Sequence, residues 1–209
     1  MLDRWSLKVI APSLKKIATL LQRAGLSANQ ITITGFVVGL SVIPLLAWHY
    51  YFAAVLVIIF NRICDGVDGE LARLNGPSDE GAFLDIVLDF IFYSAVVFGM
   101  ALSDPQQNAL PAALLLFSFM GTGSSFLAFA IMAQRKSISS IEYPNKGFYY
   151  LGGLAEGTET IMFLLAFCLF ANSFVWLAVL FSIICWLTTG TRLIGGYYSL
   201  RKLSANNHR

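Results

Sequence analysis

Charge is scarce in this 209-residue chain. Only 12% of its residues are Asp, Glu, Lys or Arg, which is about half of the ~25% that is usual in soluble domains. The net charge is +2. These values exclude an ordinary soluble globule, a disordered chain and a protein that binds nucleic acid through bulk charge. Hydrophobic residues instead make up 57% of the chain, which is typical of a polytopic membrane protein, and no nucleic acid is expected as a partner.

Cysteine and histidine are also rare, with three and two residues. Cys64, Cys168 and Cys185 lie in apolar stretches at no spacing that suits a metal or redox motif, so we expect them to pack in the interior. The first 25 residues carry charges throughout and lack an uninterrupted apolar core. No cleaved signal peptide is therefore expected.

Four stretches contain no Asp, Glu, Lys or Arg, and they are long enough to predict membrane spans. A bilayer-spanning helix needs ~20 mostly apolar residues, whereas these stretches are too long and unbroken for barrel strands. Two stretches divide into two spans each, and one reaches full length only if its helix takes Asp85 and Asp89 into the membrane region. We therefore predict an all-α membrane protein with six transmembrane helices in one bundle. Their predicted ranges are about 31–48, 51–72, 81–102, 110–134, 149–171 and 175–201.

The chain divides into an N-terminal helix at 1–26, a six-helix membrane domain at 27–203 and a short polar tail at 204–209. Apolar residues of the first region fall on one helical face. This pattern suits an amphipathic helix lying in the membrane interface, and it suits a solvated cap packed on the bundle equally well. The residues of this face are Ile10, Leu14, Ile17 and Leu21.

Basic residues predict the orientation in the membrane. With six spans, both chain ends and the loops at 73–80 and 135–148 share one side, and all 14 Lys and Arg lie there or on helix ends facing it. The connections near His49, at 103–109 and at 171–175 have none. By the positive-inside rule the basic side is cytoplasmic. We expect a multi-pass protein of the cytoplasmic (inner) membrane with both termini and the active site in the cytoplasm.

Four aspartates within 25 positions are the main functional signal, because acids in membrane helices are usually functional. Asp65 and Asp68 are spaced i, i+3, and Asp85 and Asp89 are spaced i, i+4, so each pair shares one helical face. A short loop makes the two helices antiparallel neighbours, which brings the four carboxylates together near the membrane surface. Their repulsion requires a positive partner. Oxygen ligands with no nearby His or Cys favour two Mg²⁺ or Mn²⁺ ions over zinc, and such a pair suits a diphosphate.

The neighbours of the aspartates point to a phosphate ligand. Gly69 and Gly81 lack side chains and would let a ligand approach the backbone, and Arg73 is a cation suited to a phosphate or a nucleotide oxygen. A transporter or channel with a carboxylate ion site is an alternative, but it does not explain these neighbours.

The pattern DxxDGxxAR, followed by GxxxDxxxD, resembles the signature of the CDP-alcohol phosphotransferase (CDP-alcohol phosphatidyltransferase) family, as a bacterial-type integral membrane member. The six-helix plan extends the resemblance over essentially the whole chain. One departure is that seven residues separate Arg73 from Gly81, where the family more often has eight, and this affects loop contacts rather than cation ligands. The eight matching positions are Asp65, Asp68, Gly69, Ala72, Arg73, Gly81, Asp85 and Asp89.

The resemblance implies transfer of a phosphatidyl group from a CDP-linked lipid such as CDP-diacylglycerol to a small alcohol acceptor in the bilayer, with release of CMP, in phospholipid biosynthesis. The four aspartates would bind two divalent cations that hold the donor's diphosphate, and Asp89 would also deprotonate the acceptor hydroxyl. The segment Ser27–Thr32 resembles the family's entry to its first membrane helix, which also touches the donor. A homodimer is the family expectation, and a catalytically silent scaffold is a further alternative that the retained aspartates disfavour. The implied donor contacts are Gly69, Ala72, Arg73, Ser78 and Gly81.

The acceptor stays open between two classes. Basic residues at comparable helix ends line the pocket of family members that use phosphorylated acceptors such as glycerol 3-phosphate or inositol phosphate, although positive-inside anchoring also explains Arg135 and Lys136. Glu156 and Glu159 are acids in a predicted membrane helix and need a partner such as a nearby arginine, a metal or the acceptor itself. The Glu-Gly pair at Glu156 resembles the amino-alcohol branch of the family, and this resemblance favours an unphosphorylated or amino-alcohol acceptor. The candidate acceptor residues are Arg62, Arg135, Lys136, Glu156, Glu159 and Arg192.

Overall fold

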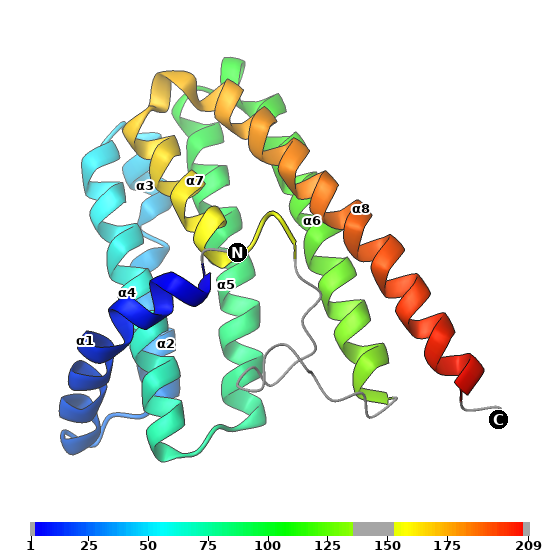
Figure 1. Ribbon diagram of the computed structural model, residues 1–209. Coiled ribbons are helices and arrows are strands. Elements are labelled where there is room, and N and C mark those ends of the chain that lie inside the picture. The colour runs from blue at the N-terminus through cyan, green and yellow to red at the C-terminus, as the bar shows by residue number, and fades with distance from the viewer. Residues whose placement is uncertain (1–2, 136–152, 207–209) are drawn as a thin grey trace.

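Helices make up all regular secondary structure in the part of the chain that the computed structural model describes, residues 3–135 and 153–206. A single 3₁₀ turn, η1, precedes the last helix (Figure 1). This confirms the all-α class. The elements are α1 (Asp3–Arg23), α2 (Ala28–Gly39), α3 (Val42–Ala47), α4 (Tyr51–Asn75), α5 (Asp79–Ser103), α6 (Pro105–Arg135), α7 (Gly157–Leu169), η1 (Ala171–Ser173) and α8 (Phe174–Asn206).

Four helical segments are long and apolar enough to cross a membrane, judged by length and composition. The 25 residues of α4 are also long enough, but from its middle onward the helix carries Arg62, Asp65, Asp68, Glu70 and Arg73. The 13 residues of α7 span about 20 Å at 1.5 Å per residue, which is short of the ~30 Å hydrocarbon core. Four membrane spans are therefore supported, and the total of six stays a prediction. The four segments are Ala28–Ala47, Asp79–Ser103, Pro105–Gln134 and Ala171–Arg201.

The predicted helix at 149–171 is wrong in its N-terminal part. Its first four residues lie outside the described chain, the next four are not helical, and α7 begins only at Gly157. Two peptide N–H groups of this stretch donate to Thr188 Oγ1 on α8, at 2.8 and 3.1 Å. The Glu156 carboxylate accepts from the Gly153 N–H at 3.1 Å. Because side chains satisfy these donors, the backbone can leave the helix without burying unpaired polar groups.

The first predicted span is interrupted between α2 and α3. Pro44 has no N–H to donate to the Leu40 carbonyl one turn earlier, and the chain breaks at Leu40 and Ser41. The Ser41 hydroxyl donates to the Val38 carbonyl at 2.6 Å. A capping box between Ser27 and Gln30 begins α2, so this helix starts three residues before the predicted one.

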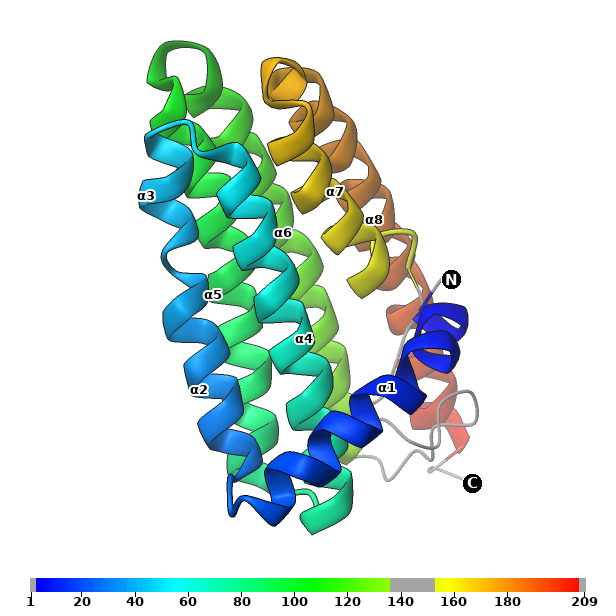
Figure 2. The ribbon, with the colours of Figure 1, turned by 90° about the vertical axis from the view of Figure 1, so that its left-hand side faces the viewer.

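The bundle packs around α5, which contacts α2, α3 and α6, while α8 runs along α6 and α7 lies against α4. Figure 2 shows α2, α4, α5 and α6 running side by side, and Figure 1 shows α6 and α8 leaning away from α4 at the lower end. Fully buried aromatic side chains fill the upper core. They include Phe92, Phe167, Phe174 and Phe181.

The amphipathic helix α1 crosses α4 near its C-terminal half (Figure 2). Leu14 and Ala18 are buried against Val67 and Leu71 of α4, whereas Ile17 is exposed. The buried face thus contains Leu14 as predicted but not Ile17. Of the two interpretations, the structure shows the packing on the bundle, and the location of α1 in the membrane interface stays a prediction.

Exposed aromatic side chains surround the turn between α3 and α4. Trp48, Tyr50 and Phe52 are each more than half exposed. This turn lies at the end of the bundle remote from the α4–α5 connection (Figure 1). Aromatic residues at such positions are typical of a membrane–water interface.

Candidate active site

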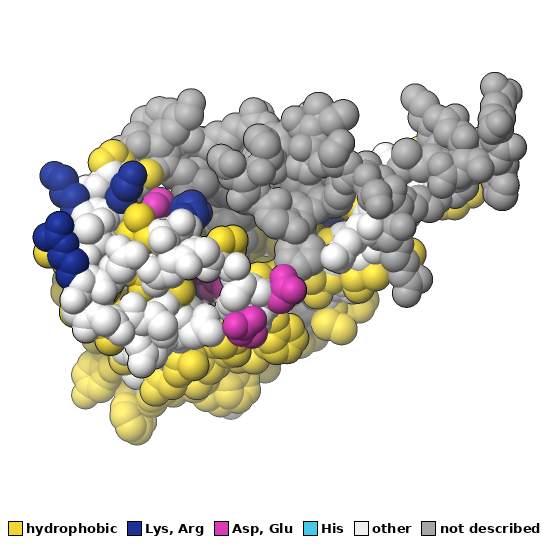
Figure 3. Space-filling model, turned by 90° about the horizontal axis from the view of Figure 1, so that it is seen from below, with side chains coloured by type: hydrophobic (Ala, Val, Ile, Leu, Met, Phe, Trp, Pro, Cys, Tyr) yellow, Lys and Arg dark blue, Asp and Glu magenta, His cyan; other side chains and the backbone are white. Residues whose placement is uncertain are grey.

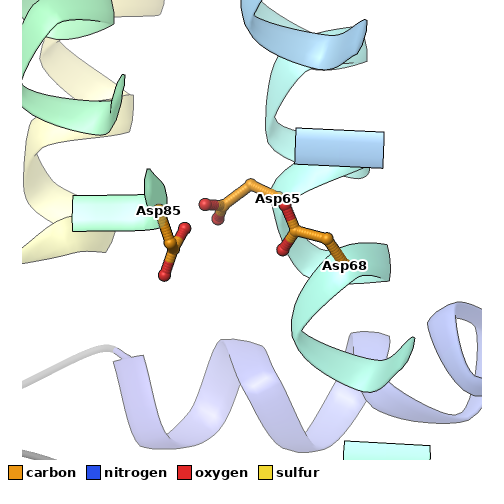
Figure 4. Close-up of side chains that lie close together, drawn as sticks. All are labelled: Asp65, Asp68 and Asp85. Atoms are coloured by element: carbon orange, nitrogen blue, oxygen red, sulfur yellow. The ribbon is translucent and has the colours of Figure 1, made fainter. Parts of the chain in front are cut away.

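Three of the four predicted aspartates come together between α4 and α5. Asp65 and Asp68 extend from α4, and Asp85 extends from α5 toward Asp65 (Figure 4). One carboxylate oxygen from each lies within 4.8 Å of the others. The spacing along two antiparallel helices therefore places these carboxylates together, as predicted.

This cluster suits a divalent cation. A cavity of about 10 Å³ lies among α2, α4 and α5 and is lined by the three aspartates, which is room for about one water-sized particle. Three carboxylates at this separation repel one another unless a cation offsets their charge. Carboxylate oxygens are the ligands that Mg²⁺ and Mn²⁺ prefer. The residues present therefore fit the predicted kind of ion.

A threonine on α2 orients one of the carboxylates. The Thr32 hydroxyl donates to Asp68 Oδ2 at 2.5 Å, and Asp68 is only 5% exposed. Thr32 closes the segment that the resemblance assigned to the donor side. Its bond to Asp68 links α2 to the cluster, and sequence reasoning did not find this contact.

Asp89 lies apart from the three-carboxylate group and is bound by Arg62. Arg62 Nη2 donates to Asp89 Oδ1 at 2.6 Å and Nη1 donates to Oδ2 at 3.2 Å. The Tyr93 hydroxyl donates to the same Oδ2 at 3.0 Å. Arg62 Nη1 also lies 3.5 Å from Asp65 Oδ2. Arg62, a candidate acceptor residue, thus supplies a positive side chain to the aspartates. Sequence reasoning missed Tyr93, although it follows Asp89 by one helical turn.

A second, larger cavity of about 470 Å³ opens on the other side of Asp85 and Asp89. Both aspartates line this cavity and the small one. Glu156 and Arg192 stand among its remaining lining residues, and each is less than a tenth exposed. Arg192 Nη1 donates to the Thr122 carbonyl at 3.1 Å, which fixes the guanidinium between α8 and α6. The structure thus places two predicted acceptor residues in the wall of the same cavity as the predicted base.

Glu159, Arg135 and Lys136 are the remaining acceptor candidates. Glu159, in the first turn of α7, is not among the residues that line the large cavity. The Arg135 side chain and Lys136 lie outside the described part of the chain.

The predicted donor contacts follow the end of α4. Arg73 is mostly exposed and Nη2 is 2.7 Å from Glu70 Oε1, and Ala72 is partly buried. A Cβ placed on Gly69 would meet only the Arg73 guanidinium, at 3.8 Å and beyond. The backbone of Gly69 is therefore open to an approaching ligand.

The start of α5 is more crowded. The Ser78 hydroxyl caps the helix by accepting from the Gly81 N–H at 3.2 Å. A Cβ on Gly81 would lie 3.0 Å from Asn29 Oδ1 and 3.2 Å from Ser78 Oγ. These contacts give Ser78 and Gly81 structural roles at the start of α5. Their predicted contact with the donor stays a prediction.

Charged side chains gather at this end of the molecule. Figure 3 views it from the side of the α4–α5 connection, with basic side chains along one edge and acidic ones elsewhere on the described face. Lys15, Lys16 and Arg23 of α1 are exposed. Hydrophobic side chains cover the flank visible beside this face (Figure 3).

Comparison with known proteins identifies relatives along nearly the whole chain. The profile of the CDP-alcohol phosphatidyltransferase family matches residues 25–189. Inner membrane protein YnjF of Escherichia coli K12 is 48% identical over 203 residues, which are 97% of this chain and 98% of that protein. Archaetidylinositol phosphate synthase of Pyrococcus horikoshii is 31% identical over 125 residues, covering 57% of this chain and 64% of that one.

Solved structures share the fold. Mycobacterium tuberculosis phosphatidylinositol phosphate synthase (PgsA1) with CDP-DAG bound has a TM-score of 0.67 and 21% identity, covering 88% of this chain and 93% of that chain. The same enzyme in complex with manganese and citrate has a TM-score of 0.67 and 22% identity, covering 88% of each chain. Together with the family profile and the eight signature residues, these matches show that the chain belongs to the CDP-alcohol phosphatidyltransferase family.

Proposed function

We propose that this protein transfers a phosphatidyl group from a CDP-linked lipid to a hydroxyl acceptor and releases CMP. One observation carries the proposal within the family. Asp85 and Asp89 line both the small cavity that suits a cation and the large cavity that could hold an acceptor. A hydroxyl in the large cavity would thus meet a phosphoryl group held at the three-carboxylate cluster.

The proposed chemistry is a direct displacement. The acceptor oxygen attacks the phosphorus that bears the lipid, the bond from that phosphorus to the CMP oxygen breaks, and the hydroxyl proton passes to Asp89. Bound divalent cations would supply positive charge to the diphosphate oxygens. Asp65, Asp68, Asp85 and Asp89 would hold these cations, and two Mg²⁺ or Mn²⁺ remain our proposal for their number and kind.

The surrounding residues position the reactants. Tyr93 and Arg62 fix the Asp89 carboxylate through hydrogen bonds to both oxygens. Arg73, beside the open backbone of Gly69, offers a guanidinium to the phosphates or the nucleotide. We place the lipid chains of the donor in the bilayer, so that only its head enters the polar site.

For the acceptor we propose a polyol phosphate such as inositol phosphate or glycerol 3-phosphate. The relative from Pyrococcus horikoshii is named an archaetidylinositol phosphate synthase, and the buried Arg192, which lines the same cavity as Asp89, offers a charge for a phosphate. An unphosphorylated or amino-alcohol acceptor is the second candidate, because Glu156 lines the same cavity.

The test is CMP release by the purified protein with CDP-diacylglycerol, Mg²⁺ or Mn²⁺, and a panel of acceptors. The panel contains glycerol 3-phosphate, inositol 1-phosphate, inositol, serine and glycerol. A phosphorylated substrate would assign Arg192 to the acceptor, whereas a neutral or amino substrate would assign Glu156. Failure to bind CDP would refute the enzyme proposal and favour an ion-binding transporter.

Orientation and assembly complete the proposal. Several apolar helices and the similarity to an inner membrane protein support an integral protein of the inner membrane. We propose that the aspartate cluster and both termini face the cytoplasm, on the side rich in basic residues. The homodimer stays a prediction.

A further inference from the structure

Every N–H group of the Arg62 guanidinium donates a hydrogen bond within or beside the aspartate cluster. Its Nε and Nη2 donate to Asn61 Oδ1, its Nη1 donates to the Tyr93 hydroxyl at 2.9 Å, and both terminal nitrogens donate to Asp89. These bonds use all five N–H donors of an arginine. The guanidinium carbon also lies 5.0 Å and 5.3 Å from the ring centroids of Tyr93 and Phe92. The Arg62 side chain is only 11% exposed, so it is held firmly in place.

In this position the positive charge of Arg62 lies next to two of the aspartates. It bonds both oxygens of Asp89 and approaches Asp65 to 3.5 Å. Asp65 is also one of the three residues of the cation cluster. An arginine in contact with both a cation ligand and the predicted base competes electrostatically with a bound metal.

Bidentate binding by Arg62 also limits what Asp89 can do. Its Oδ1 accepts from Nη2 and its Oδ2 accepts from Nη1 and from Tyr93. A carboxylate engaged in this way has fewer lone pairs to offer to a metal ion or to a hydroxyl proton. The small cavity that all four aspartates line has room for about one small particle. A second ion bound by Asp89 would therefore compete with Arg62 for the carboxylate oxygens.

We propose that Arg62 is the internal counter-ion of the aspartate cluster. In the cation-free protein it offsets the charge of Asp65 and Asp89 and holds Asp89 away from the other three carboxylates. A divalent cation fills the site of Asp65, Asp68 and Asp85 first, and loading of Asp89 displaces the guanidinium. The inference rests on the proposed cation binding but not on the identity of the acceptor. Arg62 is thus a positioning residue for Asp89.

Manganese binding tests the competition directly. Purified wild-type protein and the Arg62→Gln variant would be titrated with Mn²⁺, with free Mn²⁺ followed by electron paramagnetic resonance. We expect the weakest Mn²⁺ site to bind about tenfold or more tightly in Arg62→Gln, because a positive charge beside the cation has been removed. Arg62→Lys, which keeps the charge, should stay near the wild type. Arg23→Gln on the exposed end of α1 is the matched control and should not change binding. Unchanged or weaker Mn²⁺ binding in Arg62→Gln would overturn the proposal.

Thermal unfolding provides a second readout that separates a counter-ion from a packing residue. With a chelator, Arg62→Gln should lower Tm by several degrees, because the acids lose their compensating charge. With saturating Mn²⁺ the loss should be less than half as large, because the metal then supplies that charge. An equal loss in both conditions would mean that Arg62 only packs the core, and this would contradict the proposal.

A milder variant covers the case in which Arg62→Gln does not fold. Tyr93→Phe removes one acceptor of Arg62 and one donor to Asp89. It should shift Mn²⁺ binding and Tm in the same directions by smaller amounts, and no shift in either would refute the inference. Neither readout needs catalytic turnover. Absence of CMP release together with Arg62-dependent Mn²⁺ binding would therefore refute the proposed function alone.

Discussion

Replacing Asp89 by Asn is the sharpest test of the proposed chemistry. The change keeps the size of the side chain and removes both its charge and its basicity. A positioned general base is worth ~10²–10⁴ in rate, which corresponds to about 3–5 kcal/mol at 1.36 kcal/mol per tenfold. We therefore expect kcat for CMP release to fall by about two to four orders of magnitude.

The structure also predicts what Asp89→Asn should leave intact. The amide oxygen can still accept from Arg62, and the Tyr93 hydroxyl can rotate to accept from the new amide group. Because Asp65, Asp68 and Asp85 form a group that can hold a cation without Asp89, binding of CDP in the presence of Mn²⁺ should be retained.

The assay pairs initial rates of CMP release with equilibrium binding of CDP. Asp79→Asn, in the exposed first turn of the same helix, is the matched control and should behave like the wild type. A variant Asp89→Asn that retains most of its turnover would remove Asp89 as the base. A variant that loses CDP binding along with turnover would instead place Asp89 among the groups that hold the donor.

Four further outcomes are expected. Chelation with EDTA should abolish CMP release, and added Mg²⁺ or Mn²⁺ should restore it; persistent activity would exclude a required cation. Thr32→Val should weaken Mn²⁺ binding by roughly fivefold, in line with about 1 kcal/mol for the lost hydrogen bond to Asp68, and a titration with unchanged affinity would contradict this. Arg192→Ala should raise KM for the acceptor more than KM for the donor, and the opposite pattern in steady-state kinetics would move Arg192 to the donor. Thr188→Val leaves two buried N–H groups before α7 without their acceptor, so Tm should fall by several degrees; an unchanged melting curve would show that the connection is paired in another way.

Local spacing predicted much of the candidate site. The i, i+3 and i, i+4 aspartates on neighbouring antiparallel helices sufficed to place Asp65, Asp68 and Asp85 together, because helix geometry fixes which side chains share a face. The bond between Arg62 and Asp89 spans two helices and 27 residues. Local periodicity cannot predict it, since it depends on the relative rotation of α4 and α5.

Helix boundaries were predicted less well for a similar reason. Charge-free stretches locate apolar segments, but they do not show where the backbone finds hydrogen-bond partners outside a helix. The residues before α7 leave the helix because Thr188 on α8 accepts from them, and Thr188 is distant in the sequence. Pro44, by contrast, is a local signal that could have predicted the break between α2 and α3.

The depth of the aspartates in the bilayer follows if the exposed aromatic residues at the α3–α4 turn lie at a membrane–water interface. If Tyr51, the first residue of α4, marks one boundary of the hydrocarbon layer, Asp65 lies about 21 Å farther along the helix axis, and Asp89 lies about as far from Ser103 on α5. In a layer ~30 Å thick, both carboxylates would stand some 9 Å beneath the opposite boundary. A CDP-linked lipid could then reach them by sideways diffusion with its chains still among those of its neighbours. Its nucleotide would have to lie below the plane of the surrounding headgroups. This end of the bundle would then need a water-filled depression within the hydrocarbon layer.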